Sequence, residues 1–118
     1  DPTLVYMVMP AQATERAAEK LGLRAVREIY ADRTYADDGN LSSRKLEGSV
    51  IHDPALASAR VVAMLREKAI TTTTGRKIPA EIDTICVHGD NPAAVSMARA
   101  VREALVAEGF TLAPFAPA

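Results

Sequence analysis

Short apolar runs and longer segments of helical spacing alternate along the 118 residues of the chain. Apolar runs at residues 4–9, 23–31 and 82–87 predict strands. Residues 11–21, 55–68 and 92–108 are rich in Ala, and they predict helices. Strands that are joined through helices favour a parallel sheet. The pattern therefore predicts an α/β fold in which helices cover a mostly parallel sheet.

Caps and breakers mark where the predicted helices begin and end. Asp53-Pro54 and Asn91-Pro92 each place a capping side chain before a proline at the first helical position, and Gly22 and Gly109 end two of the helices. The apolar spacing predicts that the following residues face the core: Ala55, Ala59, Val62, Leu65, Ala94, Ala98, Val101 and Leu105. The opposite face of helix 55–68 is expected to be solvated.

Three further segments complete the pattern. Residues 32–48 contain little apolar content and predict a long loop, which in a compact domain is often either functional or disordered. Residues 69–79 predict a short hairpin. Residues 110–113 are interpreted as a last short strand.

Composition excludes several classes of function. Fourteen Lys+Arg balance 15 Asp+Glu, and the basic residues form no stripe with aromatics, which argues against a general nucleic-acid binder. No apolar run approaches the 18 or so residues of a membrane span, and no targeting segment opens the chain, so a cytoplasmic protein is expected. Cys86, the single cysteine, predicts a small buried hydrophobe. Because the chain opens with Asp1-Pro2, it is expected to be a fragment.

Polar side chains follow two of the predicted strands at their carboxyl ends. Because such ends meet at one edge of a parallel sheet, where ligands bind, we expect these side chains to surround a common pocket. The candidates are Glu28, Asp32, Arg33, Tyr35, Arg44, His88, Asp90 and Asn91.

Each candidate also has a structural interpretation. His88 can hydrogen-bond a loop carbonyl, and Asp90 can be a turn or cap residue. Asp32 and Arg33 can form a structural salt bridge, with Glu28 as its third member. Tyr35 can anchor the loop through its ring. His52, which precedes a helix cap without polar neighbours, is expected to face solvent.

A metal site is weakly supported by the sequence. His88 and Asp90 stand two residues apart, but the clusters of Cys or His that make zinc sites recognisable are missing. We therefore expect no tightly bound metal.

Two segments together resemble a known family. Residues 28–35, followed by Gly39 and Arg44, and then residues 86–91 resemble the LamB/YcsF family of 5-oxoprolinase A subunits, in the family's order. The resemblance covers the carboxyl-terminal half of a typical member, so residues 1–118 are interpreted as half of its barrel domain. The family's amino-terminal motifs have no counterpart here.

The resemblance implies an irregular (β/α) barrel of the glycoside hydrolase/deacetylase type. It also implies ATP-dependent opening of 5-oxoproline to L-glutamate together with subunits B and C, with Mg as the counter-ion of ATP. The isolated chain is then expected to be inactive, and to form a homodimer or pack against the missing half.

The implied site divides the chemistry among the candidates. His88 or Asp90 would orient or deprotonate water, and Glu28 and Asp32 would hold a neighbouring cation. Arg33 and Arg44 would clamp a phosphate or the substrate carboxylate. Tyr35 and Asn91 are included among the substrate-binding residues. A lactam or carbohydrate deacylase on the same scaffold, and a non-catalytic binding or regulatory module, remain alternatives.

Overall fold

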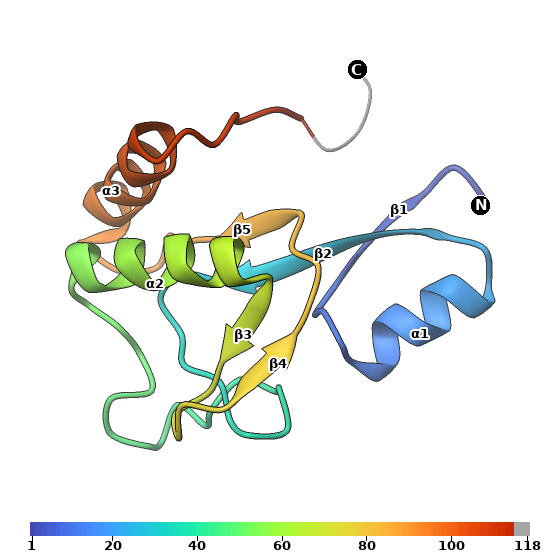
Figure 1. Ribbon diagram of the computed structural model, residues 1–118, viewed down its shortest axis with the longest axis horizontal. Helices are drawn as coiled ribbons and strands as arrows, with labels where there is room; N and C mark the ends of the chain where they lie inside the picture. The colour runs from blue at the N-terminus through green and yellow to red at the C-terminus, as the bar shows by residue number, and fades with distance from the viewer. Residues whose placement is uncertain (115–118) are drawn as a thin grey trace.

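A three-stranded parallel sheet forms the centre of the fold in the computed structural model, which describes residues 1–114 (Figure 1). Its strands are β1 (Val5–Val8), β2 (Arg24–Tyr30) and β5 (Thr84–Cys86), in the order β1-β2-β5. In the register, Ile29 lies beside Ile85 and Tyr30 beside Cys86. The predicted α/β class and parallel sheet are confirmed, and the chain itself forms an open segment of sheet that ends at β1 and β5.

Three helices accompany the sheet: α1 (Ala13–Lys20), α2 (Pro54–Glu67) and α3 (Ala94–Ala107). The cap predicted for α2 is confirmed, because Oδ1 of Asp53 accepts a hydrogen bond of 2.9 Å from the N–H of Ala55. Figure 1 shows α2 across β2 and β5, α3 above the amino end of α2, and α1 beside β1. Among residues 1–114, no helix is both long and apolar enough to cross a bilayer.

The predicted hairpin is confirmed and is tied to the long loop. Strands β3 (Ala69–Thr71) and β4 (Lys77–Pro79) pair in antiparallel orientation. At the hairpin turn, the hydroxyls of Thr72 and Thr74 each donate a 2.6 Å hydrogen bond to Oδ1 of Asp37. Residues 32–48 contain no helix or strand. The two hydrogen bonds to Asp37 therefore fix this loop against the hairpin.

The faces that α2 and α3 bury agree only in part with those predicted. The buried residues of α2 are Ala57, Ser58, Val61 and Met64, and those of α3 are Met97, Val101 and Leu105. Val101 and Leu105 were predicted correctly, whereas Ala55, Ala59 and Ala98 are exposed. Alanine occurs on every side of these helices, so the spacing of alanines did not distinguish the inner face.

Helix α3 begins two residues later than predicted. Oδ1 of Asn91 accepts from the N–H of Ala93 at 3.0 Å, and the carbonyl of Asn91 accepts from the N–H of Ala94 at 3.2 Å. These bonds close a turn before the helix, so Asn91 does not cap α3 and Pro92 is not its first residue. The predicted strand at residues 110–113 is also wrong, because this segment pairs with no strand in the described part of the chain.

Candidate functional site

Most of the predicted site residues line one small cavity. It has a volume of about 150 Å³ and lies where β2 and β5 give way to loops. It is lined by Asp32, Arg33, Arg44, Val50, His52, His88, Asp90 and Asn91. The cavity therefore brings together side chains from the segments after β2 and β5, which are far apart in the sequence. This was predicted because these segments follow the carboxyl ends of parallel strands.

His88 and Asp32 form the central pair of this cavity. Nδ1 of His88 lies 2.8 Å from Oδ1 of Asp32 and 3.0 Å from Oδ2. The carboxylate side chain is only 6% exposed, whereas the imidazole is 24% exposed. A carboxylate can only accept at this contact, so the neutral imidazole carries its proton on Nδ1 and leaves Nε2 with a free lone pair. The pairing replaces both the loop-carbonyl interpretation of His88 and the Asp32–Arg33 salt bridge.

The backbone around Asp32 is held by α2. Arg60 donates one hydrogen bond to the carbonyl of Ala31 and one to the carbonyl of Arg33, both at 3.2 Å. The N–H of Ile51 donates to the carbonyl of Asp32 itself at 2.8 Å. Burial lowers the pKa of the Arg60 guanidinium. Three consecutive carbonyls therefore have donors, which restricts how the Asp32 side chain can point.

Two arginines give the cavity the means to bind an anion. Arg33 is 7% exposed, and its Nη2 donates to the carbonyl of Ser42 at 2.8 Å. Its Nε is buried and has no hydrogen-bond partner among the described residues. Arg44 lines the same cavity from the loop. A buried guanidinium N–H without an acceptor is costly, and a carboxylate or phosphate oxygen would satisfy it.

Glu28 and Tyr35 are not brought to the cavity. Glu28 lies in β2, two residues before Tyr30 on the same face of the sheet. Its negative charge adds to the effect of burial, which is the main cause of the raised pKa of Tyr30. Tyr35 is fully buried, and its hydroxyl accepts from the N–H of Tyr30 at 2.9 Å. Burial raises the pKa of Tyr35 to about 12. Tyr35 thus anchors the loop in this structure.

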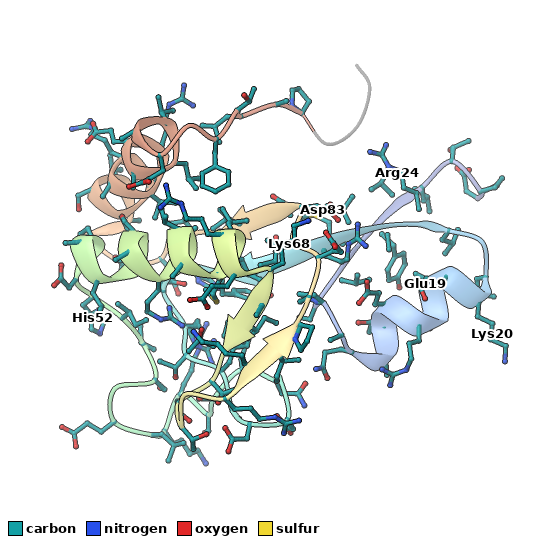
Figure 2. The ribbon with its side chains drawn as sticks, viewed as in Figure 1. Glu19, Lys20, Arg24, His52, Lys68 and Asp83 are labelled. Atoms are coloured by element: carbon teal, nitrogen blue, oxygen red, sulfur yellow. The ribbon has the colours of Figure 1, made fainter. Side chains whose placement is uncertain are left out.

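Three residues of the site region were not predicted from the sequence to take part in it. Arg60 lies opposite the predicted core positions of α2, on the face expected to be solvated, although its guanidinium reaches the loop backbone. Tyr30 was counted as a strand residue, although its ring stacks on His88. His52, which Figure 2 labels just before α2, is exposed, as predicted, but it also lines the cavity. Of these three residues, only His52 could have been recognised from the sequence, because it follows an apolar segment as His88 does.

The cavity is lined by side chains of both charges. Within residues 1–114, no group of three or more His, Cys, Asp and Glu side chains is arranged to hold a metal. Arg33 and Arg44 lie beside the carboxylates of Asp32 and Asp90, so the cavity offers positive charge as well as negative.

Comparison with known proteins decides the family. The model of the LamB/YcsF family matches residues 1–118. The chain belongs to the LamB/YcsF family. The predicted resemblance is thereby confirmed.

Relatives within the family show how much of a member the chain represents. It is 47% identical over 116 residues to the A subunit of 5-oxoprolinase from Rhodopseudomonas palustris (strain BisB18), covering 98% of this chain and 46% of the relative. It is 48% identical over 117 residues to the protein of the same name from Azorhizobium caulinodans, covering 99% and 46%. The chain thus spans about half the length of the relatives it matches.

A solved structure supports the fold. The lactam utilization protein from Thermus thermophilus superposes with a TM-score of 0.86 at 38% identity. The match covers 98% of this chain and 45% of that protein. The arrangement of β1, β2 and β5 with their helices is therefore one that a LamB/YcsF member adopts within a chain about twice as long.

Proposed function

We propose that the Asp32–His88 pair is the general base of a cyclic-amide hydrolase, and that the complete protein opens 5-oxoproline to L-glutamate. The observation that carries the proposal is the contact of 2.8 Å between Nδ1 of His88 and Asp32 beside a cavity of about 150 Å³. The names of the relatives, which refer to 5-oxoprolinase and to lactam utilization, support the substrate class.

The chemistry follows from the protonation state of the imidazole. With its proton on Nδ1, His88 can accept a proton at Nε2 from a water molecule. The resulting hydroxide attacks the carbonyl carbon of the ring, the ring C–N bond breaks, and the imidazolium returns the proton to the leaving nitrogen. Asp32 remains ionised throughout and stabilises the imidazolium, as carboxylates do in comparable triads. Asp90, exposed at the same cavity, is proposed to orient the water.

The proposed role of ATP is to activate the lactam amide, which is otherwise unreactive toward water. Transfer of the terminal phosphoryl group of ATP to the lactam oxygen, with release of ADP, would make the carbon a better electrophile. Addition of water and cleavage of the ring C–N bond would then leave an acyl phosphate, which a second water would hydrolyse to L-glutamate and phosphate. Arg33 and Arg44 are the residues that would hold the phosphate or the substrate carboxylate. The buried Nε of Arg33 fits this role. The cavity of about 150 Å³ is smaller than the roughly 300–1,000 Å³ of a typical ligand pocket, so it fits one phosphate or carboxylate group of a larger ligand.

The proposal includes an assembly. The relatives are named as one subunit of 5-oxoprolinase, which points to a multi-subunit enzyme, and we propose subunits B and C as the partners. Packing on an amino-terminal half, ATP with Mg, and a cytoplasmic location are parts of the same proposal.

The test measures glutamate release from 5-oxoproline by the complete protein with subunits B and C. We expect release only with ATP, and loss of release in His88→Ala with the folded state intact. Lys20→Gln, an exposed change on α1, is the control and should retain full activity. Release without ATP would favour a deacylase, and an unaffected His88→Ala variant would refute the proposed base.

A further inference from the structure

The imidazole of His88 is packed against an aromatic ring from the neighbouring strand. The ring centroids of Tyr30 and His88 lie 5.4 Å apart with an interplanar angle of 16°, which is a stacked arrangement. The sheet creates this contact. Tyr30 is the last residue of β2 and pairs with Cys86, and His88 follows Cys86 by two residues. The pairing of β2 with β5 therefore brings the rings of Tyr30 and His88 side by side.

Stacking supplies a constraint that the hydrogen bond to Asp32 cannot. A hydrogen bond at Nδ1 fixes one atom of the ring but leaves the ring free to rotate about the line from Nδ1 to the carboxylate. A second ring lying nearly parallel removes that rotation, because tilting the imidazole would drive it into the phenol. With Asp32 at one edge and Tyr30 on one face, the direction of Nε2 is determined.

Tyr30 is itself held in place. Its backbone N–H donates to the hydroxyl of the fully buried Tyr35 at 2.9 Å. Burial, followed by the negative charge of Glu28, raises the pKa of its phenol, so the ring stays neutral. A neutral phenol also favours a cation on its face, and His88 becomes such a cation when it accepts a proton.

We propose that Tyr30 is a positioning residue that fixes the direction of the His88 imidazole through ring stacking, and that its ring, not its hydroxyl, carries this role. The inference rests on the proposed function of His88. Nothing in the resemblance or in the names of the relatives assigns Tyr30 a part in the site.

The kinetic test compares ring and hydroxyl in the complete protein with subunits B and C. Tyr30→Phe keeps the ring and should retain kcat within about twofold. Tyr30→Ile removes the ring but suits a strand, and should lower kcat about 10- to 100-fold with little change in KM, because misplacing a reacting group by about 1 Å has a cost of that order. Tyr6→Ile, at a half-exposed tyrosine of β1, is the matched control.

A spectroscopic test does not depend on a variant that folds. The chain contains two histidines, so the ring signals of His88 can be distinguished from those of His52 by NMR. In the unsubstituted chain we expect nuclear Overhauser contacts between the rings of Tyr30 and His88, and ring-current shifts at His88 that persist in Tyr30→Phe. The absence of these contacts, wild-type kcat in Tyr30→Ile, or an equal loss in Tyr30→Phe would each overturn the inference.

Failure of this inference can be distinguished from failure of the proposed function. His88→Ala is assayed beside the Tyr30 variants. Full activity in His88→Ala would refute the proposed base and this inference with it. An inactive His88→Ala beside a fully active Tyr30→Ile would refute only the positioning role.

Discussion

Nδ1 of His88 lies 2.8 Å from Oδ1 of Asp32, although 56 positions separate the two residues in the chain. This contact joins the end of β2 to the segment after β5. It also decides which nitrogen of the imidazole is available, because the carboxylate can only accept a hydrogen bond.

The first prediction concerns the tautomer of His88. In histidine labelled with ¹⁵N, the neutral ring of His88 should carry its proton on Nδ1. In Asp32→Asn the amide can donate instead, so a substantial Nε2–H population should appear at His88, while His52 should keep its own tautomer. A proton on Nε2 in the unsubstituted chain would contradict the assigned pair.

A second prediction concerns Arg60. Arg60→Met removes the donors to the carbonyls of Ala31 and Arg33, and unfolding experiments in urea should show a loss of about 1–3 kcal/mol for groups left unpaired. Arg66→Met, on the same helix, breaks only an exposed ion pair with Glu108 and should cost at most about 1 kcal/mol. Equal stability of the two variants would show that the hydrogen bonds of Arg60 contribute little to the free energy of unfolding.

The third prediction is a pH dependence of the loop. Hydrogen bonds from Thr72 and then Thr74 lower the pKa of Asp37 below its ordinary value of 3.8. A carboxyl whose folded pKa is lowered stabilises the fold fully above the unfolded value, and this contribution is lost as the pH falls through the folded pKa.

Asp37→Asn should therefore be less stable than the unsubstituted chain near pH 7, and the two should converge in acid. Urea unfolding at a series of pH values measures the difference. Glu47→Gln, an exposed change in the same loop, is the control. A difference that does not vary with pH would show that the charge of Asp37 is not what holds the hairpin to the loop.

A fourth prediction separates Tyr35 from the chemistry. Tyr35→Phe leaves the N–H of Tyr30 without its acceptor, so thermal or urea unfolding should show a loss of about 1–3 kcal/mol. Because Tyr35 is fully buried and outside the cavity, and because the pairing of Tyr30 with Cys86 in the sheet still holds Tyr30, kcat of the folded complete protein should change little. Tyr6→Phe, at a half-exposed position, should affect neither quantity. A large fall in kcat with unchanged stability would instead return Tyr35 to the substrate-binding residues.

Residue pattern alone predicted the sheet and a common pocket for the residues that follow β2 and β5, because the alternation of strands and helices implies parallel pairing, which brings strand ends together. It did not predict the direct contact of Asp32 with His88. It did not predict the contacts of Arg60 or Tyr30, since a long side chain on a helix and a ring in a strand can each point to several neighbours. The start of α3 was also missed, because Asn91 can close a turn as readily as it can cap a helix. Residues 110–113 have strand-like composition, but a strand also requires a neighbour with which to pair.

The central claim, that Asp32 and His88 act together as the base, is tested most directly by the kcat of Asp32→Asn in the complete protein with subunits B and C. This substitution keeps the size of the side chain and removes its charge. We predict a fall in kcat of about 100- to 10,000-fold, the usual contribution of a general base, with KM within about twofold. Wild-type kcat in a correctly folded Asp32→Asn protein would contradict the claim.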